Sequence, residues 1–223
     1  MKEISQYLDY TILKADTTKD MIVKICNEAK ENNCASVCVN PYYVELAKSL
    51  LKGSQVKVCT VVGFPLGATT AEVKSYEASQ AIQNGAEEID MVINIGALKN
   101  KEYAVVYDDI RKVLNVCRDG KALLKVIIET CLLTDEEKEN AAQIVAEVGA
   151  DFVKTSTGFS TGGATMPDVK LIKAIVGNKV HIKASGGIRD FATACAMIEA
   201  GADRLGTSKL ITKETVNDSK GRY

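Results

Sequence analysis

The stretch "GADFVKTSTGF", residues 149–159, carries much of the information needed to predict the fold. A glycine that follows a helical pattern, here residues 135–148, can adopt the left-handed conformation that ends a helix. The apolar run "DFVKT", residues 151–155, comes directly afterwards and has the length of a short buried strand. The same order of glycine, alanine and acid occurs in "GAEEID", residues 85–90, and in "GADRLG", residues 201–206. A helix end joined at once to a strand, three times over, indicates a repeated unit.

Strand-like and helix-like patterns alternate along the chain, which favours a parallel sheet. Eight such units in 223 residues predict the α/β class and a single (β/α)8 TIM barrel that forms one domain, residues 1–223, with a short polar tail from about residue 215. An open, doubly wound sheet is the alternative, but no G-x-G-x-x-G follows the first strand. Strands are expected at 7–13, 35–39, 56–62, 88–94, 123–129, 151–155, 180–184 and 203–207. Helices are expected at 20–32, 71–83, 102–117, 135–148, 167–176 and 189–200.

Charge and composition exclude several classes of partner. A formal net charge of -1 and a pI near 6.0 give no long-range attraction to nucleic acid or to an anionic membrane, so neither is predicted as a partner. Apolar runs fall short of the roughly 20 residues that span a bilayer, and the first ten residues lack the apolar core of a signal peptide. A cytoplasmic protein with seven reduced cysteines is expected. Its single histidine, His181, argues against a zinc site, so no metal is predicted.

Two lysines near strand ends are candidates for chemistry, because a barrel places its active site at the carboxyl ends of its strands. Lys154 shares its parity with Phe152 and can point into the barrel, while Val153 lies on the other face. Lys183, in "VHIKA", reaches the same end of the next strand. Two ammonium groups in one confined space disfavour protonation, and the pKa of either lysine is expected to fall toward neutrality. A neutral amine attacks carbonyl groups.

Asp90 in "EEIDMVINIG" is a carboxylate within an apolar strand and could pair with a lysine and pass protons. Each of these three residues also has an ordinary structural explanation. A lysine at a strand end is usually solvated, and an aspartate in a strand is often an ion-pair partner. Together the three favour a functional site.

The loops after the last two strands suggest a phosphate site. "SGGI", residues 185–188, and "GTS", residues 206–208, would expose backbone amides at a helix N-terminus, where barrels often bind phosphate. Glycines in these loops could instead simply permit turns. After the third strand, Thr69 and Glu72 have the spacing of a capping box that would start the helix at 71. Gly63, Pro65 and Gly67 predict an irregular loop there without assigning it chemistry.

These motifs resemble one family. "GFPLGATT" with Lys74 and Glu77 beyond it, "EIDMVINIGAL", "FVKTSTGF", "IKASGGIR" and "RLGTS" are similar, in this order and over nearly the whole chain, to deoxyribose-phosphate aldolase. The resemblance implies a class I aldolase that interconverts 2-deoxy-D-ribose 5-phosphate with D-glyceraldehyde 3-phosphate and acetaldehyde in deoxyribonucleotide catabolism. It implies a small sugar phosphate as substrate and a homodimer or homotetramer. A protonated imine is itself an electron sink, so neither cofactor nor metal is expected.

The resemblance also implies roles for individual residues. Lys154 would form the Schiff base, Lys183 would lower the pKa of Lys154, and Asp90 would transfer protons with a bound water. Asp9 and Cys38 would lie near the substrate. The phosphate-binding loops would be formed by Gly158, Gly186, Gly187, Gly206 and Ser208.

The chain departs from the family at two places, and two other functions fit part of the pattern. Phe159 stands where some members have a lysine that contacts phosphate, and Tyr223, the last residue, stands where some members have a tyrosine that assists proton transfer. An isomerase or synthase on the same barrel would bind a sugar phosphate without a covalent lysine. A non-catalytic sugar-phosphate sensor would keep only the loops.

Overall fold

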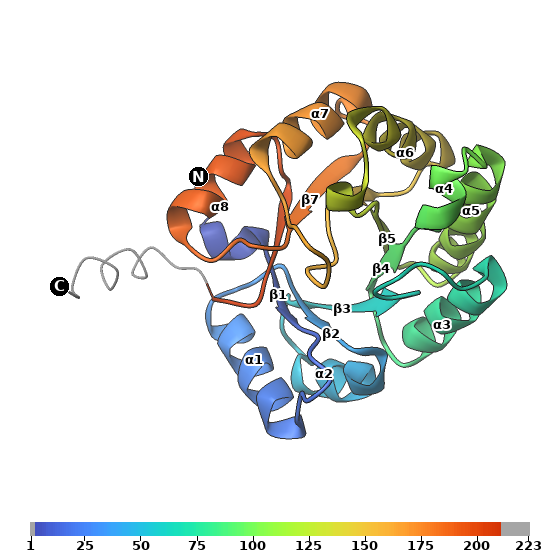
Figure 1. Ribbon diagram of the computed structural model, residues 1–223. Helices are drawn as coiled ribbons and strands as arrows, with labels where there is room; N and C mark the ends of the chain where they lie inside the picture. Colours follow the sequence, from blue (N-terminus) through green and yellow to red (C-terminus); the bar gives the residue numbers. More distant parts are fainter. Residues whose placement is uncertain (1–2, 211–223) are drawn as a thin grey trace.

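The computed structural model describes residues 3–210, in which eight parallel strands close into a barrel surrounded by helices (Figure 1). Each strand pairs with its neighbours in sequence order, and β8 pairs with β1 to close the sheet. The predicted TIM barrel is therefore confirmed, and the open-sheet alternative is wrong. The strands are β1 Leu8–Ile12, β2 Ser36–Val39, β3 Lys57–Val62, β4 Glu88–Val92, β5 Leu123–Ile127, β6 Phe152–Lys154, β7 His181–Ser185 and β8 Arg204–Thr207.

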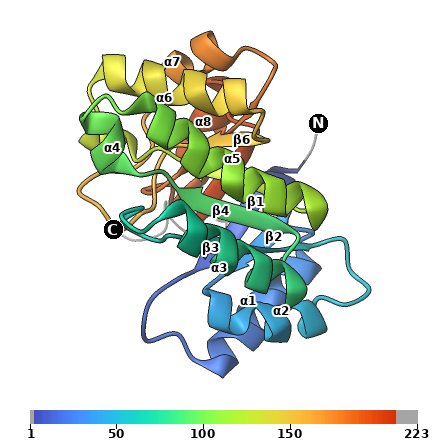
Figure 2. The ribbon, with the colours of Figure 1, turned by 90° about the vertical axis from the view of Figure 1, so that its right-hand side faces the viewer.

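Helices pack around the outside of the sheet (Figure 2), and α5 packs against α3 and β5. The six predicted helices are present, each with its ends within two residues of the expected positions; α2 and α4, which are short, were not predicted. The helices are α1 Lys19–Glu31, α2 Val44–Leu50, α3 Ala71–Gln83, α4 Ile95–Lys99, α5 Tyr103–Asp119, α6 Asp135–Val148, α7 Met166–Val176 and α8 Phe191–Glu199.

The glycines that predicted the fold end their helices as expected. Gly85, Gly149 and Gly201 all have positive φ, between 83° and 118°, just before β4, β6 and β8. One detail of the predicted helix starts is wrong. The N-cap of α3 is Thr70, whose hydroxyl accepts from the amide of Val73, so Thr69 and Glu72 do not form the capping box. The helix begins at 71, and the residue directly before it takes the capping position.

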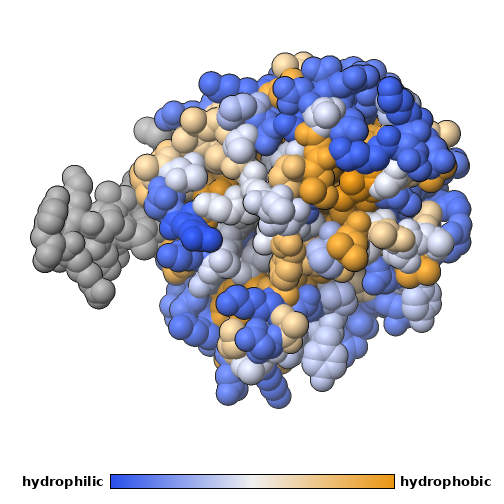
Figure 3. Space-filling model, viewed as in Figure 1, coloured by the Kyte–Doolittle hydropathy of each residue, from blue (hydrophilic) through white to orange (hydrophobic). Residues whose placement is uncertain are grey.

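The apolar core fills the space between the strands and the helices, whereas the inside of the barrel is largely polar. In β6, Val153 belongs to the core cluster, and the ring of Phe152 lies inside, 5.5 Å from the guanidinium carbon of Arg204. Lys154 follows Phe152 at the same parity and points inward, as predicted. Seen from the carboxyl ends of the strands, apolar side chains gather near the centre of this face within a more hydrophilic rim (Figure 3).

Two expectations concern residues outside 3–210. The polar tail from about residue 215 and Tyr223 both lie outside the described residues. Among the helices of the described part, none has the length and apolar character needed to cross a membrane.

Candidate active site

A cavity of about 620 Å³ opens where the strands end. Its walls come from the ends of β1, β6, β7 and β8 and from the loops that follow them. Both lysine-bearing strands reach this region, but only one of the two lysines, Lys154, lines the cavity. The predicted phosphate-loop residues all line it: Gly158, Gly186, Gly187, Gly206 and Ser208.

Lys154 and Lys183 meet at one carboxylate. They are directly opposite one another in the β6–β7 pairing. Lys154 Nζ lies 2.7 Å from Oδ2 of Asp90, and Lys183 Nζ lies 2.6 Å from the same oxygen. The Asp90 side chain is fully buried, and both lysines are nearly so. The structure therefore brings the three predicted residues into contact.

Three further charged residues belong to this cluster and were not predicted as site residues. Lys125 of β5 is fully buried and contacts Oδ1 of Asp90 at 2.9 Å. It also contacts Glu88 at 2.6 Å, and Glu88 in turn contacts Arg204 of β8. Lys125 pairs with Asp90 across the sheet, so its inward parity in "LLKVII" was the available signal. Glu88 and Arg204 lie at strand starts, where no site was expected.

Asp9 lies at the base of the cluster and does not line the cavity. It forms ion pairs with Lys183 and with Lys125, and its Oδ1 lies 2.5 Å from Arg204. Ser36 donates a further hydrogen bond to it at 2.7 Å. These contacts indicate that Asp9 holds the two buried lysines in place. A position near the substrate was expected, but Asp9 does not line the cavity.

The charges of the cluster stabilise one another. Burial alone would raise the pKa of Asp90, but Lys125, Lys154 and Lys183 together hold it well below its ordinary value. Burial alone would lower the pKa of Lys183, but Asp9 and Asp90 outweigh burial and raise it. The expectation that the pKa of either lysine falls is therefore wrong for Lys183, because sequence parity showed the second ammonium but not the second carboxylate.

The predicted phosphate loops form one wall of the cavity. Gly187 has φ 82° and open space where a side chain would begin, whereas a Cβ on Gly206 would lie 2.8 Å from that of Ser185. The expected helix N-terminus is already capped, because Asp190 accepts from the amide of Thr193 at 2.8 Å. The cap takes up one amide of the first turn of α8, and the glycine loop before the helix lines the cavity.

Cations and an aromatic pair complete the mouth. Lys14 and Arg189 line the same cavity and were not predicted as site residues. Phe159, at the position of the expected lysine, is 53% exposed and meets the ring of Phe64 edge-on, with ring centroids 5.2 Å apart. An apolar contact thus joins the loops after β3 and β6 where some family members carry a charge.

A buried glutamate holds the loop after β6. Glu129 follows β5 in the left-handed region, at φ 57° and ψ 65°, which is costly for a residue with a side chain. Its carboxylate accepts from the hydroxyl of Thr157 at 2.5 Å and from the Thr157 amide at 3.2 Å. No lysine, arginine or histidine of residues 3–210 forms an ion pair with it. Strain retained beside a cavity is typical of a position fixed for function.

The loop after β3 is held by the two residues noted beyond "GFPLGATT". Glu77 accepts from the amide of Gly63 at 2.7 Å. Lys74 is fully buried, donates to the carbonyl of Val92 at 2.9 Å and pairs with Asp109 at 2.6 Å. These contacts tie α3 and α5 to the ends of β3 and β4, so both residues support the loop from behind the cavity.

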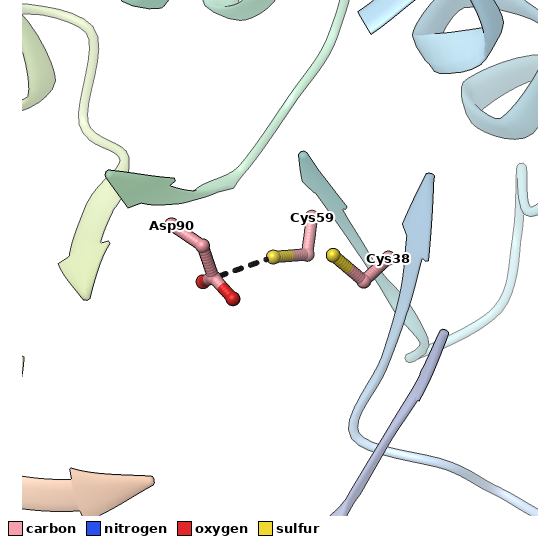
Figure 4. A group of neighbouring side chains, drawn as sticks. All are labelled: Cys38, Cys59 and Asp90. Atoms are coloured by element: carbon pink, nitrogen blue, oxygen red, sulfur yellow. Dashed lines mark hydrogen bonds between the residues drawn. The ribbon is translucent and has the colours of Figure 1, made fainter. Parts of the chain in front are cut away.

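Two thiols stand beside Asp90 (Figure 4). Cys59 of β3 donates to Oδ1 of Asp90 at 3.2 Å, and Cys38 of β2 lies next to Cys59 with its sulfur turned toward it. Both side chains are fully buried, and Cys38 does not line the cavity where a substrate contact was expected. The ligand atoms of Cys38, Cys59 and Asp90 lie within 4.8 Å of one another, as in a metal site. Lys125 already contacts both Cys59 and Asp90 there, which opposes a cation.

Comparison with known proteins gives consistent matches over the whole barrel. Residues 4–211 match the family model described as DeoC/LacD family aldolase. The chain is 60% identical over 218 residues to a deoxyribose-phosphate aldolase of Clostridium tetani, covering 98% of this chain and 100% of that protein. It is 57% identical over 223 residues to the deoxyribose-phosphate aldolase of Halalkalibacterium halodurans, covering 100% and 99%.

Solved structures of aldolases also match the fold of this chain. The fold matches "QR15, an Aldolase" with a TM-score of 0.92 and 42% identity over 99% of both chains. It also matches a deoxyribose phosphate aldolase from Aeropyrum pernix, described as tetrameric, with a TM-score of 0.86 and 31% identity over 92% of this chain and 86% of that one.

Proposed function

Because this chain belongs to the DeoC/LacD family of aldolases, we propose that it reversibly cleaves 2-deoxy-D-ribose 5-phosphate to D-glyceraldehyde 3-phosphate and acetaldehyde through a Schiff base on Lys154. The substrate is inferred from the names of the relatives and from the glycine loops of the cavity. The covalent lysine is inferred from the geometry of the charged cluster. We also infer from the resemblance that the reaction belongs to deoxyribonucleotide catabolism.

The observation that carries the choice of nucleophile is the exposure of the three clustered lysines to the cavity. Lys154 lines the cavity, whereas Lys125 and Lys183 are fully buried beneath it. Among residues 3–210, Lys154 has one carboxylate within 4.0 Å, Asp90, while Lys183 has two and Lys125 has three. Lys154, the lysine with the fewest ion pairs, loses the least electrostatic stabilisation when its ammonium group gives up a proton. It is also the one that a substrate can reach.

The proposed reaction begins when the Lys154 amine adds to the aldehyde carbon of the open-chain sugar and water leaves, giving a protonated imine. A base then takes the proton of the C3 hydroxyl, the C2–C3 bond breaks, and its electrons form the enamine. Glyceraldehyde 3-phosphate departs. Protonation of the enamine carbon and hydrolysis of the imine release acetaldehyde and restore the amine.

Asp90 is suited to moving these protons. Its Oδ2 contacts Lys154 and Lys183, and its Oδ1 is held by Lys125 and Cys59, so each oxygen has a fixed direction. Its lowered pKa keeps the carboxylate ionised, so it accepts a proton only briefly and passes it on. Lys183, whose pKa is raised, remains a cation beside the imine and can act as the donor.

The phosphate end of the substrate fits the wall formed by the loops after β6, β7 and β8. Gly186 and Gly187 lie in the loop before α8, so their backbone amides are not part of a helix. The side chains of Lys14 and Arg189 add positive charge to the same cavity. Phosphate oxygens accept from backbone amides and from cations of this kind. Phe159 contributes no charge.

Borohydride trapping tests the proposal. The chain incubated with deoxyribose 5-phosphate and borohydride should gain a stable adduct on the peptide that contains Lys154, and the Lys154→Met variant should gain none. An isomerase or synthase would turn over or bind the sugar phosphate without a trapped adduct, and a sensor would bind it without turnover. Substrate binding without trapping by the unaltered chain would therefore refute the Schiff base.

Assembly, extent and compartment are further parts of the proposal. The tetrameric relative from Aeropyrum pernix supports a homo-oligomer, a dimer or a tetramer. We propose that residues 1–223 act as one domain, supported by a family match that covers residues 4–211. A cytoplasmic location is proposed from the sequence, as above.

A further inference from the structure

Cys38 and Cys59 form a close thiol pair that the aldolase reaction does not use. They are direct partners in the pairing of β2 with β3. Neighbouring strands run about 4.8 Å apart, and a disulfide accepts Cα separations of roughly 4.4 to 6.8 Å. The two sulfur atoms lie within 4.8 Å of each other and side by side in Figure 4. A bond between them needs a small approach of the side chains and little movement of the strands.

We propose that Cys38 and Cys59 are an oxidation site, at which a hydroperoxide converts the two thiols into a disulfide and reversibly stops the enzyme. The loss of activity, though not the disulfide itself, rests on the proposed role of Asp90.

The surroundings of the two thiols differ, and they favour a different role for each thiol in the oxidation. The neighbouring thiol of Cys59 lowers the pKa of Cys38; burial and Asp90 oppose this effect, and Lys183 and Lys154 add to it. Burial, the contact with Cys38 and the charge of Asp90 raise the pKa of Cys59 well above its ordinary value. Cys38 therefore supplies the thiolate that a peroxide attacks, and Cys59 keeps its proton.

The chemistry balances with one hydroperoxide. The Cys38 thiolate attacks a peroxide oxygen, the O–O bond breaks, and a sulfenic acid forms as the first water or alcohol leaves with a proton. Cys59 sulfur then attacks the sulfur of Cys38; the S–S bond forms, the S–O bond breaks, and hydroxide leaves with the Cys59 proton as water. Two thiols are oxidised by two electrons, and one peroxide is reduced.

The pair lies close behind the active-site cavity, through which we expect the peroxide to arrive. Lys154 lines the cavity, Asp90 contacts Lys154 at 2.7 Å, and Cys59 contacts Asp90 at 3.2 Å. The Asp90 carboxylate therefore lies between Cys59 and Lys154, the residue that lines the cavity. Hydrogen peroxide, little larger than water, needs less room than any sugar.

Oxidation changes what Asp90 touches. A thiol has one proton, and in the reduced chain Cys59 donates it to Oδ1 of Asp90. The disulfide has no such proton, so this bond is lost, and the contact of Lys125 Nζ with the Cys59 thiol at 3.2 Å is altered with it. Oδ1 of the carboxylate that contacts both Lys154 and Lys183 then keeps Lys125 but loses the hydrogen bond from Cys59.

The test uses the full chain with the exposed Cys131 and the partly exposed Cys195 both changed to serine. This background removes the two most accessible thiols and leaves the proposed site intact. After hydrogen peroxide treatment, peptide mapping without reductant should show the Cys38 and Cys59 peptides joined, with the mass of two hydrogen atoms lost. Aldolase activity should fall at least tenfold and return with dithiothreitol.

Single variants separate the two steps. In the same background, Cys59→Ala should stop at a Cys38 sulfenic acid that dimedone captures, and Cys38→Ala should leave Cys59 reduced. Peroxide treatment that leaves both thiols free, or that joins either one to another cysteine, would overturn the proposal even if activity fell. A Cys38–Cys59 disulfide with unchanged activity would keep the oxidation site and refute the role assigned to Asp90.

Discussion

Lys154 and Lys183 lie opposite one another in adjacent strands, and their ammonium nitrogens both contact one oxygen of Asp90. The two lysines differ in their access to the cavity, because Lys154 lines it and Lys183 does not. Lys183 also forms an ion pair with Asp9, whereas within residues 3–210 the shared Asp90 is the one carboxylate paired with Lys154. This asymmetry assigns different duties to two chemically identical side chains, and each of them can be measured.

Replacing each lysine with methionine, which is similar in length and uncharged, should separate these duties. Lys154→Met should abolish both turnover and borohydride trapping. Lys183→Met should still trap substrate on Lys154, while kcat falls by about 10² to 10⁴, as is usual when a proton-transfer group is removed. Circular dichroism should first show that each variant is folded. Trapping by Lys154→Met and none by Lys183→Met would reverse the assignment.

The charged cluster should make the protein sensitive to acid only at low pH. For Asp9 and Asp90, burial is outweighed by nearby cations, Lys125 foremost, and the pKa of each is lowered. The folded state therefore binds protons less readily than the unfolded chain. The resulting stability is fully present above the unfolded carboxyl pKa of about 3.9 and is lost as the pH falls through the lowered values.

Urea unfolding at a series of pH values measures this dependence. The contribution of the cluster to the free energy of unfolding should stay constant from pH 7 to about 5 and decrease below about pH 4. Asp90→Asn should lower stability at pH 7 and flatten the decrease in acid, while the exposed Asp16→Asn should match the wild type. An Asp90→Asn profile parallel to that of the wild type would show that the carboxylate gains nothing from its neighbours.

A bulky residue at Gly187 should weaken phosphate binding specifically. Gly187→Leu places its side chain in open space at the cavity wall, with a cost of about 1 to 2 kcal/mol for the positive φ. KM for deoxyribose 5-phosphate should rise about tenfold or more, and KM for unphosphorylated deoxyribose much less. Gly149→Leu is the matched control, because Gly149 has nearly the same φ and equal open space but ends α6 away from the cavity. Equal losses on both substrates would make the loop structural.

Phe159→Lys should restore the charge that some relatives have at this position. The side chain is half exposed and lines the cavity, so an ammonium there can remain solvated and reach a phosphate. We expect KM for the phosphorylated sugar to fall several-fold, more at low salt than at high salt, because the gain is electrostatic. Phe159→Met, which removes the ring without adding charge, should not lower it. Equal effects of the two variants would point to the Phe64 contact instead.

Cleavage should not depend on a divalent metal. The carboxylate beside Lys154 is bound to ammonium groups, and in the proposed reaction the imine would supply the electron sink. Activity measured after prolonged dialysis against a chelator should equal that of the untreated protein. A large loss that zinc restores would replace the Schiff-base proposal with a metal-dependent one.

The fold could be predicted from the sequence because strand-like and helix-like patterns alternate and one junction signal recurs. Gly85, Gly149 and Gly201 mark the same junction three times, and the structure confirms all three. The missed helices, α2 and α4, have seven and five residues, too few for a periodic pattern to be distinguished from a loop. The start of α3 at residue 71 was predicted correctly, but its cap was misplaced by one residue, because Thr69 and Thr70 are equally good caps by composition.

The site was predictable only in part. Lys154, Lys183 and Asp90 are conspicuous because each is a charge within an apolar strand. Lys125 has the same signal but lies in a run read only for its apolar character. Its partner Glu88, on the neighbouring strand, also contacts Arg204 of the last strand, and only closure of the barrel brings Glu88 and Arg204 together. The raised pKa of Lys183 depends on contacts that form only when the barrel closes, and the sequence alone did not show them.

The bond between Asp9 and Arg204 spans 195 positions of the chain, from the first strand to the last. Because a ribosome makes the chain from its N-terminus, Asp9 is synthesised well before Arg204. A nascent chain of the first seven strands holds carboxylates whose guanidinium has not yet been synthesised, so its barrel is open and its interior charges are unbalanced. A chain that lacks the last strand therefore leaves Asp9 and Glu88 without the guanidinium of Arg204, and we expect it to lack the proposed activity.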